Sequence, residues 1–358
     1  MYSGVVEGVG ARYCPSIEDK LVRFSDKERH QLFLEPETKE FDTIYLQGMS
    51  SSLPKDVQEQ FVRTLPGLEN CKILKYAYAI EYDAFNPLQL FLTLESRIIK
   101  NLFLAGQING TSGYEEAAGQ GLIAGINAIS KLKGLEPLIL RRDEAYIGVM
   151  IDDLVTKGTK EPYRLLTSRS EFRLLTRHDN SYKRLSKYAC YYQLISNDEY
   201  AFIQKRLKMI DDLIDYTKQV YINSSMKTLV NYMLEHQHEN YLGLTLYDFI
   251  KRPNVCLKDI MPLIEYIVED DLIYELAQIE IKYAGYIEKA KRDATKLEQL
   301  ENIKIPIDFD YSSVNHLALE ARSKLELIRP MTIGQAQRIS GVNPADITML
   351  LMSLKKQK

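Results

Sequence analysis

The stretch NLFLAGQINGTSGYEE, residues 101–116, decides how the first half of the chain folds. Its apolar start, residues 102–105, predicts a short strand, and the glycines at 106, 110 and 113 remove Cβ atoms that would keep a ligand from the backbone. The helix predicted after Gly113 offers unpaired N–H groups and the positive end of its dipole. The stretch therefore predicts a ligand-binding turn from strand to helix. On the residues alone, the alternative is that the glycines only make a tight connection.

The predicted helix carries small residues on one side. They recur at three- and four-residue spacing, at Ala117, Gly121, Ala124, Gly125 and Ala128. This spacing places them on one helix face, so we expect close packing of that face against a strand or another helix.

The two halves of the chain differ in pattern. Up to about residue 135, short β-like runs at 43–45, 72–80 and 102–105 alternate with Pro and Gly punctuation, and a helix is expected between Pro54 and Pro66-Gly67. After about residue 145 helical patterns dominate. The clearest cover 198–220, 224–237 and 270–299, with two short helices at 333–339 and 344–355 capped by Thr332 and Asn343. The sequence predicts an α/β region followed by an all-α region.

Composition favours a soluble, cytoplasmic protein of more than one domain. The chain has 358 residues, 45% of them hydrophobic, and a net charge of −3. We find no apolar run long enough to span a membrane and no secretion signal. The four cysteines, Cys14, Cys71, Cys190 and Cys256, are scattered, and the five histidines form no ligand cluster. We therefore expect reduced thiols and no metal site.

A basic segment runs from Lys157 to Lys187, with nine Lys or Arg against three acids. If the segment is helical, Arg169, Arg173 and Arg177 share one face. Interleaved aromatic residues offer stacking surfaces, so the segment suits a nucleic-acid backbone with unpaired bases. The alternative is a solvated face with internal ion pairs to Glu171 and Asp179.

Residues 105–118 (AGQINGTSGYEEAA) resemble the second flavin motif of the glucose-inhibited division protein A family. Further blocks resemble that family in the same order, at 8–24 (GVGARYCPSIEDKLVRF), 158–177 (GTKEPYRLLTSRSEFRLLTR) and 333–347 (IGQAQRISGVNPADI). The family comprises the FAD-dependent tRNA uridine 5-carboxymethylaminomethyl modification enzymes.

One family feature is absent from residues 1–30. Family members begin with a strand and a G-x-G-x-x-G turn for the FAD diphosphate, whereas Gly4, Gly8 and Gly10 lack that spacing. The resemblance therefore implies the C-terminal portion of the family fold, and a chain that alone is an incomplete and inactive flavoenzyme. The implied fold is the C-terminal part of a Rossmann-like, glutathione-reductase-type FAD-binding domain with an inserted segment, then a helical C-terminal domain. We predict boundaries at 1–144, 145–303 and 304–358.

The resemblance assigns cofactor residues. Gly106, Gln107, Asn109, Gly110 and Gly113 are implied for FAD. The block matching the family's NADH site comprises Gly10, Ala11, Arg12, Tyr13, Cys14, Pro15, Ser16, Ile17, Glu18, Asp19, Lys20, Leu21, Val22, Arg23 and Phe24. Cys14 is the implied catalytic residue, and Ala11 stands where the family usually has proline. A thiol beside cations has a lowered pKa and suits a nucleophile; the alternative is an inert core cysteine.

The resemblance also assigns partners. Arg164, Arg169, Arg173 and Arg177 are implied for tRNA, and Arg338, Ser340 and Gly341 for docking a GTPase; the alternative for the last three is a terminal capping subdomain. The family acts as a homodimer that joins the GTPase in a heterotetramer, with methylenetetrahydrofolate as one-carbon donor and no membrane association.

The implied function is addition of a carboxymethylaminomethyl group to C5 of wobble uridine 34. Two alternatives stay open: a module that only binds tRNA or the GTPase, and a relative of the folate- and FAD-dependent tRNA uridine methyltransferases. The long helical region after residue 145 disfavours the methyltransferase, and flavin colour on purification would argue against the binding module.

Overall fold

Two compact units make up the protein in a computed structural model that describes residues 16–78, 83–159 and 161–356. Unit 1 comprises residues 1–137 and 153–165, and unit 2 comprises 138–152 and 166–358. The division falls within helix α4 (Tyr146–Lys157).

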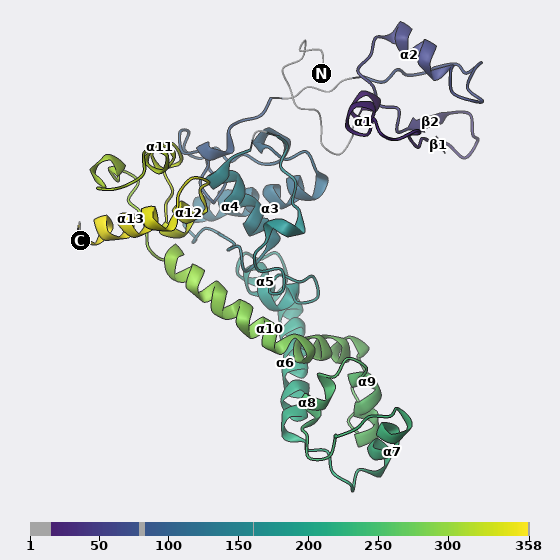
Figure 1. Ribbon diagram of the computed structural model, residues 1–358, viewed down its shortest axis with the longest axis vertical. Coiled ribbons are helices and arrows are strands. Elements are labelled where there is room, and N and C mark those ends of the chain that lie inside the picture. Colours follow the sequence, from purple (N-terminus) through teal and green to yellow (C-terminus); the bar gives the residue numbers. More distant parts are fainter. Residues whose placement is uncertain (1–15, 79–82, 160, 357–358) are drawn as a thin grey trace. The chain divides into compact units, whose positions relative to one another are not determined.

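Unit 1 holds a single two-stranded sheet among its described residues. Strand β1 (Phe33–Pro36) pairs antiparallel with β2 (Ile44–Gln47), with Phe33 opposite Gln47. Helices α1 (Ile17–Arg23), α2 (Lys55–Val62) and α3 (Tyr114–Lys133) belong to the same unit (Figure 1). The predicted helix after Pro54, the run at 43–45 and the helix after Gly113 are confirmed.

Two strand predictions are wrong. Residues 72–78 form no strand, and 79–80 lie outside the described residues. Residues 102–105 contribute only an isolated bridge between Phe103 and Glu95. An apolar run becomes a strand only where a neighbouring strand offers its N–H and C=O groups, and the described residues supply no such partner here. The α/β character is confirmed coarsely, while the Rossmann-like sheet stays a prediction.

Unit 2 is helical, as predicted. The helices predicted at 198–220, 224–237 and 270–299 are α6, α7 and α10, and the capped pair at 333–339 and 344–355 is α12 and α13. Helix bounds are α5 Ser181–Tyr191, α6 Asn197–Gln219, α7 Lys227–Glu235, α8 Leu246–Ile250, α9 Leu257–Ile260, α10 Asp271–Glu301, α11 Leu319–Ile328, α12 Ile333–Arg338 and α13 Pro344–Lys356.

Caps fix where these helices begin. Ser196 and Glu199 form a capping box at α6, and Asp270 caps α10. The hydroxyl of Thr332 accepts from the Gln335 N–H at 3.0 Å, and the Asn343 side chain accepts from the Asp346 N–H at 3.0 Å. The two predicted caps are therefore confirmed.

The long helices α6 and α10 contact each other and carry the main core of unit 2 (Figure 1). Apolar side chains of α7, α8 and α9 fill one end of this pair. Fully buried members include Leu213, Leu229, Met233, Phe249, Ile260, Ala277 and Ile281. Burial of such side chains contributes about 1.5–3 kcal/mol each, which makes this cluster a rigid base for the surface around it.

A buried ionic network joins the rest of unit 2. The Asp152 carboxylate accepts from Arg142 Nη1 at 2.9 Å and from Arg338 Nε and Nη2, each at 2.7 Å. Arg338 also pairs with Glu301 at the end of α10, and Arg142 donates to both oxygens of Glu171. Arg142 and Asp152 are each 4% exposed. Charges this deeply buried depend on their partners.

We predict that Arg338→Met destabilises unit 2 by about 3–5 kcal/mol, because removing one partner leaves the buried Asp152 carboxylate undercompensated. Urea unfolding followed by far-ultraviolet circular dichroism measures this. Lys296→Met breaks the exposed pair with Asp293 and serves as control, with an expected change below about 1 kcal/mol. Equal stability of the Arg338→Met variant and the unchanged chain would contradict a structural role for the network.

Candidate functional site

The glycine-rich turn before α3 is built around a buried amide. Residues Gly106–Asn109 form one turn of 3₁₀ helix, Gly110 follows with φ of 82°, and Gly113 is the N-cap of α3. The Oε1 atom of Gln120 accepts from the Gly106 N–H at 3.0 Å and from Asn109 Nδ2 at 2.9 Å. Its Nε2 atom donates to Thr111 Oγ1 at 3.1 Å. Gln120 in the second turn of α3 therefore fixes the shape of the loop in front of it.

Gly110 is required by its own surroundings. Its positive φ disfavours any side chain, and a Cβ atom there would lie 3.0 Å from Thr159 Cγ2. The Gly110 carbonyl accepts from the Tyr163 N–H at 2.7 Å. At this position the glycine serves close internal packing, which is the alternative that the sequence left open.

Of the five residues implied for FAD, Gln107 presents the side chain that a ligand can reach. Gln107 is exposed, whereas Asn109 is fully buried with its amide nitrogen held by Gln120. The Oδ1 atom of Asn109 and the Oγ atom of Ser112 are buried without a hydrogen-bond partner. The turn thus combines one exposed amide with two unsatisfied polar atoms.

The start of α3 lacks a side-chain cap. Gly113 has no side chain that could accept from the first N–H groups, and Tyr114 beside it is 91% exposed. Glu116 turns inward and accepts from the Leu165 N–H at 3.2 Å. Unfilled N–H groups and the positive helix end attract an acceptor or an anion. An exposed amide donor, an uncapped helix start and the unpaired Ser112 hydroxyl fit a flavin, which has acceptor atoms along one edge of its ring.

The small-residue stripe of α3 is buried only in part, since Ala124 is buried and Ala117 and Ala128 are half-buried. Gly121 and Gly125 are exposed, and among the described residues no atom lies within 4 Å of a Cβ built on either. Ile123, Ala124, Ile126 and Asn127 are the buried residues of this part of the helix. The buried side of α3 therefore mixes apolar and polar residues, whereas Leu122 and Ile129 on the same helix are 49% and 50% exposed.

The described part of the NADH block, residues 16–24, uses its polar side chains internally. Ser16 and Asp19 form the capping box of α1, and Lys20 donates to the Gly48 carbonyl at 2.8 Å. Glu18 Oε1 accepts from Ser51 Oγ at 2.8 Å and from the Ser52 N–H at 3.1 Å. Leu21, Val22 and Phe24 are exposed. Residues 10–15, with Cys14, lie outside the described residues, so the NADH and catalytic assignments remain predictions.

The basic segment is not a continuous helix. One 3₁₀ turn covers Thr167–Arg169, and 171–175 form turns, so the predicted shared face of Arg169, Arg173 and Arg177 is wrong. Phe172 and Leu175 are buried on Ile287 and Ala294 of α10. Anchoring these apolar side chains sets the path of the segment instead of a helical repeat.

Acids from distant parts of the sequence neutralise much of the segment. Arg177 is bound by Asp179 and by Glu280 of α10, and these carboxylates raise its pKa although burial lowers it. Lys183 pairs with Asp211, and Lys187 with Glu144. The expected ion pair to Asp179 is therefore present. Arg164 and Arg173 are exposed and Arg169 is half-buried, so Arg164 and Arg173 are the more accessible candidates for RNA contact.

The residues implied for GTPase docking differ in exposure: Arg338 is largely buried, and Ser340 and Gly341 are at the surface. The Arg338 side chain is 11% exposed and its guanidinium is bound by Asp152 and Glu301; these acids raise its pKa against the opposing effect of burial. Ser340 and Gly341 are exposed in the turn between α12 and α13. A Cβ at Gly341 would lie 2.5 Å from Glu320 Oε1. Arg338 therefore supports the turn from inside, and docking remains a prediction for the turn itself.

Comparison with known proteins places these elements in a class. Residues 1–136 match the family model "Glucose inhibited division protein A". Residues 197–291 and 293–358 match "tRNA modifying enzyme MnmG/GidA C-terminal helical domain" and "C-terminal helical bundle". The fold and its matched regions are those of a tRNA-modifying enzyme class. The chain belongs to the glucose-inhibited division protein A (MnmG/GidA) family.

Individual relatives are similar to this chain over nearly its whole length. The tRNA uridine 5-carboxymethylaminomethyl modification enzyme MnmG of Mycoplasmopsis synoviae is 56% identical over 358 residues, which are 100% of this chain and 57% of that protein. The MnmG of Acholeplasma laidlawii is 54% identical over 99% of this chain and 57% of its own length. Aquifex aeolicus GidA in its form II crystal aligns with a TM-score of 0.80 and 46% identity, over 97% of this chain and 55% of that one. The chain thus spans somewhat more than half the length of these relatives.

We predict that the hydrogen bonds of Glu18 make α1 sensitive to acid. Partial burial alone would raise the pKa of Glu18, but bonds from the backbone and from Ser51 hold it below its usual range. A depressed folded-state pKa means that this stabilisation is complete above the unfolded value, about 4.3, and is lost as the pH falls through the folded value.

Amide hydrogen exchange of Ser52 and α1 measures this effect, after correction for intrinsic rates. Protection should fall in the unchanged chain as the pH drops below about 4, while Glu18→Gln should show weak protection throughout. Exposed Glu28 provides the control variant Glu28→Gln. The same acid response in the Glu18→Gln variant as in the unchanged chain would contradict the prediction.

Proposed function

We propose that this chain forms part of an FAD-dependent enzyme that modifies uridine 34 of tRNA. With a GTPase partner, the enzyme adds a carboxymethylaminomethyl group to C5 of the base. Membership of the MnmG/GidA family supports the tRNA uridine chemistry. The observation that carries the flavin part is the exposed Gln107 amide in front of the uncapped start of α3.

FAD, when bound, would supply redox chemistry and take part in carbon transfer, with NADH as reductant and methylenetetrahydrofolate as one-carbon donor. Gln107 and the first N–H groups of α3 would hold the cofactor's ring edge, and the dipole of α3 would favour negative charge there. The folate part of the proposal is supported by membership of the MnmG/GidA family.

The base itself must be activated, because C5 of uridine is a poor nucleophile. A thiolate such as that of Cys14 would add to C6, which moves the C5=C6 electron pair toward the O4 carbonyl and makes C5 nucleophilic. After the new bond forms at C5, loss of the C5 proton expels the thiolate and restores the double bond. Exposed Arg164 and Arg173 would bind phosphates of the tRNA.

The proposal also includes assembly of the enzyme with its GTPase partner. The turn at Ser340 and Gly341 is the proposed contact for the GTPase, in a heterotetramer built on a homodimer in the cytoplasm. No helix among the described residues is long and apolar enough to cross a membrane. If the chain is instead a module that only binds tRNA or the GTPase, it should bind no FAD. The next experiment distinguishes these two possibilities.

We predict that Gln107→Leu weakens FAD binding about tenfold. The substitution removes one or two hydrogen bonds to the ligand, which together contribute about 1.4 kcal/mol, and this energy corresponds to a tenfold change in Kd. Flavin absorbance and fluorescence are titrated with the purified chain, alone and mixed with a segment that supplies the remaining length of a relative. Gln299→Leu, an exposed amide on α10, is the matched control. If neither preparation binds FAD, the flavin proposal fails and the binding module is favoured.

We predict that Cys14→Ser in the corresponding full-length enzyme abolishes uridine modification while FAD stays bound. The expected loss follows from the weaker nucleophilicity of a hydroxyl than of a thiolate. Mass spectrometry of nucleosides from treated tRNA reports the product, with Cys190→Ser as control. Retained activity in the Cys14→Ser variant would overturn the catalytic role.

A further inference from the structure

Glu116 connects the start of α3 to a segment far along the chain. It is the third residue of that helix and is 5% exposed. Its Oε1 atom accepts a hydrogen bond from the Leu165 N–H at 3.2 Å, although 49 residues separate the two in sequence. Burying a carboxylate is costly unless hydrogen bonds compensate it. The contact with Leu165 therefore helps Glu116 to face inward, and it holds the chain at residue 165 beside the helix.

Tyr163 fixes the other end of the same short segment. Its N–H donates to the Gly110 carbonyl at 2.7 Å, and it forms an isolated parallel bridge with Thr111. Its hydroxyl donates to Asp153 Oδ2 at 2.9 Å, and Lys157 donates to Oδ1 of that carboxylate at 2.7 Å. Tyr163 is 3% exposed. The segment is thus anchored to the glycine-rich turn through its backbone and to α4 through a side chain.

Arg164 lies between these two anchored residues. Tyr163 is buried, Arg164 is exposed and Leu165 is half-buried. The backbone of Arg164 is therefore held beside the glycine-rich turn, while its side chain reaches the surface. Of the four arginines implied for tRNA, Arg164 is the one that belongs to unit 1, the unit that contains the turn.

We propose that Glu116 is a positioning residue for the tRNA substrate. By holding the Leu165 N–H, it fixes the backbone of Arg164 beside the turn, so that the phosphate bound by Arg164 belongs to a nucleotide next to the uridine that reacts. Glu116 acts through Leu165 and Arg164 and is not a catalytic residue. This inference rests on the proposed function, because it takes FAD as the ligand of the turn and tRNA as the substrate.

Two substitutions of Glu116 separate its hydrogen bond from its charge. Glu116→Gln and Glu116→Ala both remove the carboxylate, but the glutamine amide keeps an oxygen that can accept from the Leu165 N–H. With alanine, that N–H loses this acceptor and the segment loses one of its anchors. Rescue by glutamine therefore reports positioning through Leu165 and not the charge of the side chain.

The test uses the corresponding full-length enzyme with its GTPase partner and unmodified tRNA. We expect Glu116→Ala to raise the KM for tRNA about tenfold and to leave kcat within about twofold, because a phosphate contact contributes equally to the bound and transition states. Glu116→Gln should keep the KM within about twofold of the unchanged enzyme. Filter binding gives the Kd for tRNA without turnover. Flavin fluorescence gives the Kd for FAD, which should stay within about twofold in both variants.

A double-mutant cycle with Arg164→Gln tests whether Glu116 acts through Arg164. Two residues that act through one contact have non-additive effects. Arg164→Gln alone should raise the Kd for tRNA about tenfold, and adding Glu116→Ala should raise it by less than about a further twofold. If Glu116→Ala does not fold, Tyr163→Phe takes its place in the cycle, because it removes the hydroxyl bond to Asp153 and keeps the ring and the backbone N–H.

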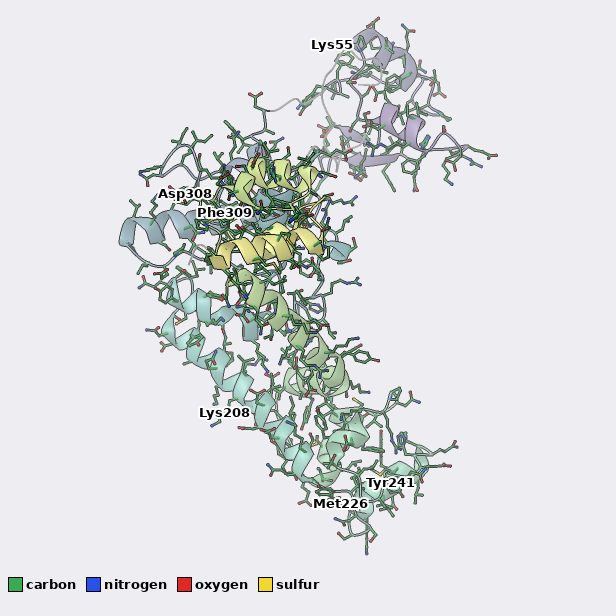
Figure 2. All side chains as sticks on the ribbon, turned by 60° about the vertical axis from the view of Figure 1, so that its left-hand side comes forward. Lys55, Lys208, Met226, Tyr241, Asp308 and Phe309 are labelled. Carbon is green, nitrogen blue, oxygen red and sulfur yellow. The ribbon has the colours of Figure 1, made fainter. Side chains whose placement is uncertain are left out.

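Matched controls lie close by in unit 1. Glu115 is exposed in the same turn of α3, and Glu115→Ala should leave the KM for tRNA unchanged. Lys55 on α2 is exposed and labelled in Figure 2, and Lys55→Gln controls for the loss of a surface cation in Arg164→Gln. Circular dichroism of each variant reports whether the helices are intact.

The outcomes separate this inference from the proposed function. If the unchanged enzyme binds no FAD or does not modify tRNA, both are overturned. If it does both, the role of Glu116 alone is overturned by additive effects in the cycle, by an unchanged KM in Glu116→Ala, or by equal losses in Glu116→Ala and Glu116→Gln. Weaker FAD binding with an unchanged Kd for tRNA would also overturn it and would assign Glu116 to the flavin turn alone.

Discussion

The bidentate contact of Arg338 with Asp152 is the interaction on which unit 2 depends. Asp152 also receives Arg142, while Arg338 reaches Glu301 and Arg142 reaches Glu171. These residues come from α4, α10, α12 and the segments before α4 and α5. Arg142 and Asp152, each 4% exposed, would cost several kcal/mol to bury alone, so the elements that carry their partners must meet in one arrangement. The network therefore acts as a constraint on geometry more than as a source of stability.

In the basic segment, too, the partners of the charged side chains come from distant parts of the sequence. Its sequence suggests a strongly cationic surface, yet Glu280, Asp211 and Glu144, far away in the chain, pair with its cations. What remains available is set by which apolar residues anchor the segment: Phe172 and Leu175 face α10 and leave Arg173 outside. Candidate RNA contacts follow from this three-dimensional charge balance and not from the local count of Lys and Arg.

At the glycine-rich turn, the buried amide of Gln120 holds the loop in the shape that exposes the amide of Gln107. Gln120 bonds the Gly106 N–H, the amide nitrogen of Asn109 and the Thr111 hydroxyl from inside, and Gln107 lies outside in front of α3. Sequence comparison with the family singles out the glycines and Gln107. The sequence does not indicate that Gln120 is buried, because a glutamine within a helix is usually expected on the solvent-exposed side. The shape of the turn and the exposure of Gln107 are both consequences of that buried side chain.

By itself, the sequence determined the helices, their caps and the family, because these depend on contacts between residues close in the chain and on ordered motifs. The helices at α6 and α10 and the caps at Thr332 and Asn343 follow from such local patterns. Only the tertiary structure decided that 102–105 forms no sheet strand, that Arg338 points inward and that Gly121 and Gly125 face outward. A strand, an ion pair and a packed face each need a partner that is distant in sequence, and the free energy of burying one side chain depends on which partner the fold brings to it.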